Sequence, residues 1–424
     1  MDLIRGLGLV SLLLASLYCH GIEYQYPFDD PYVATVVGTP ADWHVRFDQP
    51  APAKHYGLPP VDGKTIPEVF WYQDRMHYAL AAQQGEAPLI FVIAGTGAGF
   101  DSSKMRLLMN AYYQAGFHVV SLSSPTYANF IATASKSGVP GNLSEDADDL
   151  YRVMGRIWEK HRDKLQVSGF YLTGYSLGAA NAAFVSRLDE QEQRFGFRKV
   201  LLINPPVSLF NSVNRIDAML SDNLDVNDPA SVNKFLARLL DRVAELYIQS
   251  ERLTLDEDTL YKLYQHGQPK QESLSTLIGM SFRLSSANMI FTSDVMANQG
   301  LLKPKNLELG SADSLTDYLK ASSRVTFIEY FDDYFLPYFQ RQNPALTRDE
   351  LLEQLSLRPL DSYIRGNDKL AMVTNADDLI LAPDEVDYLR NLFGAQAKIF
   401  PNGGHCGNLA HPAFVSHITE VMRP

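Results

Sequence analysis

Three side chains that could together cleave an acyl bond occur in order along the chain. Ser176 lies in the segment 174–178, two aspartates follow at 377–378, and His405 stands in a glycine-rich segment near the end. A serine hydroxyl is a poor nucleophile until an imidazole accepts its proton, and a carboxylate holds that imidazole in the required tautomer. The order Ser, Asp, His therefore predicts acyl chemistry through a covalent acyl-enzyme.

The serine segment has the pattern Gly-x-Ser-x-Gly. A serine at the tip of a strand-to-helix turn has a strained backbone, so the residues two before and two after it must be glycine or nearly so. The preceding residues 170–173 predict a buried strand, and 179–188 predict a helix. Such a turn exposes the Ser176 hydroxyl and leaves the Leu177 amide facing the atom under attack. An ordinary strand-turn-helix joint with a surface serine is the alternative.

A second glycine-rich loop follows the apolar run at 88–94 and has the sequence Gly95-Thr96-Gly97-Ala98-Gly99. Glycine lets backbone amides approach a ligand, so the loop predicts half of an oxyanion hole. A phosphate loop is excluded by its pattern, because the G-x-x-x-x-G-K-[ST] motif is absent and no glycine completes G-x-G-x-x-G. A plain glycine-rich turn is the remaining alternative.

Strands and helices alternate from residue 88 to residue 204, which predicts a mostly parallel sheet with helices on both faces. We expect the strands in the apolar runs at 88–94, 117–122, 170–173, 199–204, 369–374 and 397–400. We expect the main helices at 105–115, 144–158, 179–188 and 385–392. Ser144 would cap the second of these helices, and the acidic residues that follow it would lie on a solvated face.

The chain before residue 88 gives weaker signals. The β-branched residues 32–39 predict a strand, the proline-rich residues 43–64 predict a loop, and residues 69–72 and 76–81 predict an antiparallel pair. Residues 125–140 are expected to form a loop. None of these segments carries residues that indicate chemistry.

Helical patterns replace the strands between about residues 210 and 366. Asp228-Pro229 predicts a helix start followed by helical apolar spacing to residue 246, and residues 347–350 predict a capping box. The segment 327–339 holds seven aromatic residues, which favours packing in a core. A lining for an apolar substrate pocket is the functional alternative.

The composition excludes some classes of protein. The chain has 424 residues, of which 46% are hydrophobic and 20% charged, which is typical of a globular protein. A net charge of -12 makes nucleic acid an unsuitable partner, because a polyanion requires a basic surface. The spacing of the histidines matches no metal-ligand motif, so we expect neither a metal nor another cofactor.

The N-terminal residues predict a signal peptide. Arg5 precedes an apolar run from Leu7 to Tyr18, and Cys19-His20-Gly21 offers small residues for cleavage. A lipoprotein anchor at Cys19 is the competing interpretation, although the bulky Tyr18 fits it poorly, and an N-terminal core helix is the third. Cleavage after Gly21 predicts a secreted or periplasmic protein in which Cys406 is the one cysteine, without an internal disulfide.

At these residues the chain resembles the α/β-hydrolase superfamily, over about residues 88–210 and 366–424. The resemblance implies that residues 22–87 form an arm and antiparallel strands that join the sheet. It also implies that residues 211–365 form a large helical cap, inserted where that superfamily places one.

The resemblance also implies roles for the candidate residues. Ser176 would be the nucleophile, His405 the base and Asp378 the acid, with Asp377 as the other available carboxylate. The amides of Leu177 and of Thr96 or Gly97 would form the oxyanion hole, and Tyr175 and Gly95 would contact the substrate. Cys406, beside the histidine, is expected to be a buried bystander whose side chain points away.

These inferences predict a serine hydrolase that cleaves acyl or lipid-like esters of small-molecule size, in contact with a membrane surface where lipids are the substrate. An acyltransferase with the same triad is one alternative, since only the group that deacylates the enzyme differs. A non-catalytic binding protein on the same scaffold is another. The sequence indicates no particular oligomeric state.

Overall fold

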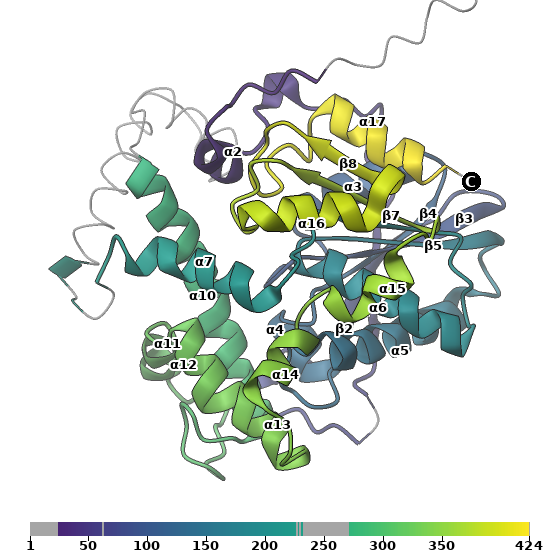
Figure 1. The fold of residues 1–424 in the computed structure, drawn as a ribbon. Helices are drawn as coiled ribbons and strands as arrows, with labels where there is room; N and C mark the ends of the chain where they lie inside the picture. Colours follow the sequence, from purple (N-terminus) through teal and green to yellow (C-terminus); the bar gives the residue numbers. More distant parts are fainter. Residues whose placement is uncertain (1–23, 62, 226–227, 229, 232–270, 424) are drawn as a thin grey trace, which may run out of the picture.

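A computed structural model describes residues 24–61, 63–225, 228, 230–231 and 271–423. Its centre is an eight-stranded sheet in the order β1-β2-β4-β3-β5-β6-β7-β8 (Figure 1). The strands are β1 (Lys54–Leu58), β2 (Met76–Ala81), β3 (Ala87–Ile93), β4 (His118–Leu122), β5 (Val167–Tyr175), β6 (Lys199–Ile203), β7 (Leu370–Asn375) and β8 (Ala397–Phe400). All six predicted buried strands are confirmed to within a few residues.

Strand β2 runs antiparallel to both of its neighbours, β1 and β4, whereas the strands from β4 to β8 are parallel. The last residue of β3, Ile93, pairs with Gly174 near the end of β5. The carboxyl ends of the parallel strands therefore meet at one edge of the sheet. The loops that carry the candidate residues all leave from this edge.

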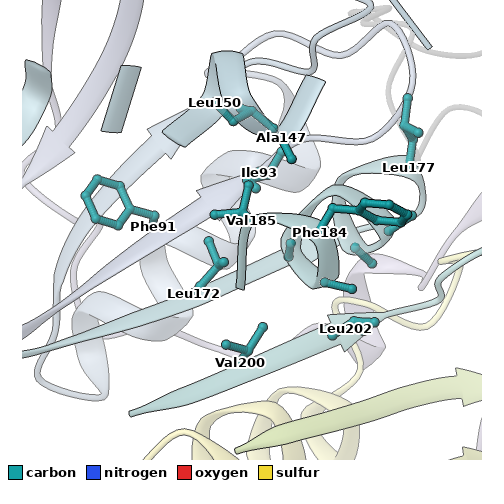
Figure 2. Packing of buried hydrophobic residues seen from close by; sticks show 14 of the residues in the cluster. Phe91, Ile93, Ala147, Leu150, Leu172, Leu177, Phe184, Val185, Val200 and Leu202 are labelled. Atoms are coloured by element: carbon teal, nitrogen blue, oxygen red, sulfur yellow. The ribbon is translucent and has the colours of Figure 1, made fainter. Parts of the chain in front are cut away.

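Helices cover both faces of the sheet. α3 (Ser103–Gln114) and α17 (Pro412–Val421) pack on one face, and α5 (Leu143–His161), α6 (Leu177–Glu192) and α16 (Pro383–Phe393) pack on the other. In β3, Phe91 and Ile93 point toward α5 and α6, as Figure 2 shows, whereas Ile90 and Val92 join the opposite cluster. Burial on both faces explains why the parallel strands are continuous apolar runs.

The N-terminal part differs from the prediction in three places. Residues 32–39 are not a strand: α2 (Pro31–Val37) begins where the Asp30 side chain accepts hydrogen bonds from two backbone amides and proline occupies the first turn. The expected loop at 43–64 contains β1, and the prolines on both sides of this short strand conceal it. Residues 68–70 form a 3₁₀ turn after a proline, so the partner of β2 is β1 and not the predicted segment.

The segment around α5 also differs. The expected loop contains α4 (Ala128–Thr133), and the N-cap of α5 is Asn142 instead of Ser144. Two of the acidic residues expected on a solvated face are buried, because the loop before α5 folds over them. Asp146 accepts a hydrogen bond from the Gly141 amide, and Asp149 accepts one from the Lys136 amide and pairs with Arg152 at 2.6 Å.

The described residues between β6 and β7 are mainly helical. The α-helices are α7 (Leu209–Ser221), α10 (Gln271–Ala297), α11 (Thr316–Ser322), α12 (Phe327–Tyr330), α13 (Leu336–Gln342), α14 (Arg348–Gln354) and α15 (Asp361–Ile364). Helices α7 and α10 to α14 lie together on one side of the sheet, whereas α15 lies beside α6 and α16 (Figure 1). The capping box at Thr347 is confirmed, and the Asp228 carboxylate accepts hydrogen bonds from two amides as a cap does.

Two predicted segments lie outside the described residues, namely the signal peptide at 1–21 and most of the helix expected after Asp228. Within the described ranges, no helix is long and apolar enough to cross a membrane.

Candidate active site

Ser176 occupies the turn between β5 and α6 with a positive φ of 55°. The two glycines of the motif are required by close backbone contacts. A Cβ on Gly174 would lie 2.2 Å from the carbonyl oxygen of Gly178, and a Cβ on Gly178 would lie 2.3 Å from that of Ile93. Only glycine fits both positions, so the local sequence forces the serine into this exposed, strained turn.

The histidine loop after β8 brings His405 onto the serine. Its Nε2 lies 2.9 Å from Ser176 Oγ, and its Nδ1 lies 2.9 and 3.1 Å from the two oxygens of Asp378. Burial lowers the pKa of His405, but the charge of Asp378, the neighbouring Cys406 and the hydrogen bond to Asp378 together raise that pKa more, so it stands well above the usual value. These are the distances that transfer of the serine proton to the imidazole requires.

The two neighbouring aspartates have different partners. The Asp378 side chain is fully buried and accepts hydrogen bonds from Asn204 Nδ2 at 2.8 Å and from the Ile380 amide at 3.1 Å. Asp377 accepts hydrogen bonds from the amides of Gly403 and Gly404 at 3.1 and 2.9 Å. Asp378 therefore orients the imidazole, whereas Asp377 holds the loop that carries it.

Helix α2 supports the histidine loop from the other side. The Thr35 hydroxyl oxygen accepts a hydrogen bond from the His405 amide at 2.9 Å, and a Cβ on Gly407 would lie 2.1 Å from the carbonyl oxygen of Ala34. Sequence reasoning missed both Thr35 and Asn204. No local signal indicates Thr35, while Asn204 is marked only by its place at the end of a predicted strand.

The candidate oxyanion donors separate into free and occupied amides. The Gly97 amide donates to Thr126 Oγ1 at 2.8 Å and is thus engaged. In the described part of the chain, the amides of Thr96 and Leu177 donate to no acceptor, and both residues line one cavity beside Ser176. Leu177 also begins α6, whose dipole favours negative charge at that end. The geometry therefore selects Thr96 and Leu177.

The two residues expected to contact substrate, Tyr175 and Gly95, do not line this cavity. Tyr175 is buried in the cluster beneath α3 and α17, and burial raises the pKa of its hydroxyl to about 12. A Cβ on Gly95 would lie 2.7 Å from the Tyr175 ring. Neither lines the cavity, because side chains alternate along β5 and that of Tyr175 turns into the core. Their contact packs the oxyanion loop onto the serine turn.

Cys406 was expected to point away from the site, but its Sγ lies 3.9 Å from His405 Nε2. The loop turns at this residue with a positive φ of 60°, which brings the side chain back toward the imidazole. The thiol is buried and lies farther from the ring nitrogen than the serine hydroxyl does. Ser176 remains the better placed nucleophile.

The cavity lies between the serine turn and the helices that follow β6, and it is predominantly apolar. Its volume is about 60 Å³, against roughly 30 Å³ for one liquid water. The aromatic segment contributes both to core and to lining: Tyr334 and Phe339 are buried in the cluster of these helices, whereas Phe327, Phe331 and Phe335 line the cavity. Among the described residues, no group of three or more His, Cys, Asp or Glu could hold a metal ion.

No family model and no curated protein matches the chain. Several solved structures do match the chain. An esterase from Pyrobaculum calidifontis is 14% identical over 89% of this chain and 86% of that chain, with a TM-score of 0.40. Brefeldin A esterase is 14% identical over 94% and 84%, with a TM-score of 0.38. A thioesterase domain from the curacin biosynthetic pathway is 13% identical over 87% and 98%, with a TM-score of 0.36.

Similarity at this level carries no argument about activity. The fold assignment rests on the chain's own topology, namely the strand order, the antiparallel β2, and the serine turn between β5 and α6. By these features the chain has the α/β-hydrolase fold.

Proposed function

We propose that this protein is a serine hydrolase that cleaves carboxylic esters through an acyl-enzyme on Ser176. The observation that carries the proposal is the unbroken line of contacts from Ser176 Oγ through the His405 ring to Asp378. Leu177 directly follows Ser176, and its amide and that of Thr96 donate to no acceptor among the described residues, while both residues line an apolar cavity. A nucleophile, a base, an orienting acid and an oxyanion site are then all in reach of one carbonyl group.

The reaction follows from these positions. His405 Nε2 takes the proton of Ser176 Oγ as the oxygen attacks the ester carbonyl, and the amides of Thr96 and Leu177 stabilise the developing oxyanion. The imidazolium then gives its proton to the leaving alcohol as the carbon–oxygen bond breaks. A water molecule, deprotonated by the same nitrogen, releases the acid and restores the serine.

The alternatives of a binding protein and an acyltransferase have separate tests. A decayed site has no physical need for the strained serine turn or for the 2.9 Å contact between Ser176 and His405. Acyl transfer uses the same residues, so product analysis with an alcohol added as acceptor separates it from hydrolysis. A transesterified product in excess of the free acid would favour the transferase.

We propose an apolar acyl group on the substrate, in preference to a peptide or sugar. The support is the aromatic and aliphatic lining of the cavity. A long, lipid-like chain requires the surrounding helices to move apart, because the cavity is much smaller than the roughly 300–1,000 Å³ of sites for drug-sized ligands.

The experiment compares wild type and Ser176→Ala on p-nitrophenyl esters of increasing acyl length. We expect turnover by wild type and a loss of roughly 10⁴-fold or more in the variant. Equal rates for the two proteins would refute a serine mechanism. Faster cleavage of peptides than of any ester would refute the substrate class.

Export of the protein is also a proposal. Its support is the basic and apolar N-terminal segment with small residues at 19–21. N-terminal sequencing of the protein recovered from a secreting host tests it, and the expected mature start is Ile22. A mature chain that retains Met1 would contradict export by cleavage.

A further inference from the structure

One ion pair stands in the otherwise apolar wall of the cavity. Asp217 of α7 and Arg283 of α10 both line it, with side chains that are 10% and 3% exposed. Arg283 donates to Asp217 Oδ1 through Nε at 2.8 Å and through Nη2. The other carboxylate oxygen accepts a hydrogen bond from the Phe327 amide at 3.3 Å. The carboxylate is therefore well satisfied.

The Arg283 guanidinium, in contrast, has a donor without an acceptor. Its Nη1 is buried and donates to no acceptor in the described part of the chain. A guanidinium carries five N–H donors, and a buried donor without a partner destabilises the protein unless a ligand or water accepts from it. Proteins rarely leave a charged group in that condition without a functional reason. Because Arg283 lines the cavity, we infer that Nη1 is satisfied by a group bound in the cavity.

Helix α10 brings this donor close to the reaction centre. The helix passes directly over the oxyanion loop, since a Cβ on Gly97 would lie 2.9 Å from the Ser285 Cβ. Ser286, the residue after Ser285, lies three positions from Arg283 on one face of this helix, and both line the cavity. Arg283 and the Thr96 amide line the same cavity, so one small acyl group can reach both.

The charge balance indicates which chemical group binds there. Asp217 neutralises Arg283, and Glu329 is near as well, because hydrogen bonds from Thr326 and then the charge of Arg283 lower the pKa of Glu329. A carboxylate on the ligand would bring an uncompensated charge into a buried, neutral pair. A carbonyl or hydroxyl oxygen accepts the Nη1 hydrogen bond without that cost.

We propose that Arg283 Nη1 binds an uncharged acceptor oxygen on the acyl part of the substrate, so that oxo- or hydroxyacyl esters are preferred to unsubstituted esters of equal length. This inference rests on the proposed ester hydrolysis and adds a substrate class to it. The arginine is a specificity residue, because it contacts the substrate away from the reacting carbonyl.

The test uses p-nitrophenyl pentanoate and its 3-oxo and 4-oxo derivatives, each with its rate of release of p-nitrophenol without enzyme as reference. The informative variant is Asp217→Asn/Arg283→Met, which removes both charges and leaves no buried ion unpaired. The matched control is Asp361→Asn/Arg365→Met, an ion pair of the same residue types at the surface, with an N–O distance of 3.1 Å. Thermal unfolding checks that both variants are folded.

For wild type and the control we expect kcat/KM, corrected by the rate without enzyme, to be roughly tenfold higher for at least one substituted ester than for pentanoate. In the variant Asp217→Asn/Arg283→Met, the ratio of kcat/KM for the substituted ester to that for pentanoate should fall to about one while pentanoate is still hydrolysed. If wild type does not prefer a substituted ester to pentanoate, as when a water satisfies Nη1, the inference is overturned. It is also overturned if Asp217→Asn/Arg283→Met keeps the same preference as wild type.

Two further results are decisive. A monosuccinyl ester that exceeds every uncharged derivative would overturn the argument for a neutral acceptor. If wild type and Ser176→Ala hydrolyse pentanoate equally, the proposed function fails and this inference fails with it. Serine-dependent hydrolysis without a substituent preference overturns the inference alone.

Discussion

At the scale of single residues, the proposed mechanism makes activity depend on the protonation of His405. An imidazolium cannot accept the serine proton, so activity requires the neutral ring. Burial lowers the pKa of His405, and the interactions of the ring with Asp378 and then with Cys406 together raise that pKa by more. The active form is therefore lost as the pH falls through a pKa above the ordinary histidine value of about 6.5.

The variant Asp378→Asn tests this electrostatic role. We expect kcat to fall roughly 10⁴-fold, because the amide favours the wrong imidazole tautomer. The acidic limb of the kcat/KM profile should also shift to lower pH, since the group that raises the pKa of His405 has lost its charge. The pH profiles of wild type and variant provide the measurement. An acidic limb at the same pH in both would show that another group titrates.

The residues of the proposed triad could be predicted from the sequence, whereas the residues that support them could not. Ser176, Asp378 and His405 each follow a predicted strand, and parallel strands end at one edge of the sheet. Thr35 and His405 lie 370 positions apart in the chain, so no local sequence pattern predicts the contact between the Thr35 hydroxyl and the His405 amide. The same reason hides the pairing of Asp217 with Arg283, which join two helices of the insertion.

At the scale of elements, α2 clamps the histidine loop. The β-branched residues of this segment predicted a strand, but the Asp30 cap and the contacts of Val33, Ala34 and Val37 in a buried cluster favour the helix. This is tertiary packing overriding local propensity. The helix contacts α10 as well as the histidine loop, so it connects the insertion to the site.

The variant Thr35→Val removes the acceptor for the His405 amide at nearly constant volume. We expect kcat to decrease roughly tenfold or more with a smaller change in KM, because a looser loop misplaces the base but leaves the cavity intact. Thr419→Val is the matched control, because the hydroxyls of Thr35 and Thr419 both donate to the backbone carbonyl four residues earlier, that of Pro31 and of Val415, and Thr419 lies on α17. Equal effects of the two variants would show that Thr35 contributes stability only.

At the scale of the whole molecule, the helices after β6 roof the carboxyl edge of the sheet and leave a cavity of about 60 Å³. The sequence predicted such an insertion, because strands and helices alternate only where the chain forms the sheet, and this alternation stops and later resumes. The size of the cavity could not be predicted. It depends on how aromatic side chains from distant helices interlock, which the sequence pattern does not specify.

This packing predicts that acyl length is limited by the aromatic wall. Phe327 is half-buried and lines the cavity, whereas its neighbour Ile328 is 51% exposed. We expect Phe327→Ala to raise the kcat/KM of octanoate relative to butyrate roughly tenfold, because the lost ring makes room for a longer chain. Ile328→Ala should leave the ratio unchanged. A ratio that moves equally in both variants would mean that the wall does not select acyl length.

The central claim is that Ser176, held by the turn after β5, is the nucleophile. Its most direct test is fluorophosphonate labelling followed by peptide mapping, applied to wild type, Ser176→Ala and Cys406→Ala. We predict one adduct on the Ser176 peptide in wild type and in Cys406→Ala, and none in Ser176→Ala. Folded wild-type protein without an adduct, or with the adduct on Cys406, would contradict the account.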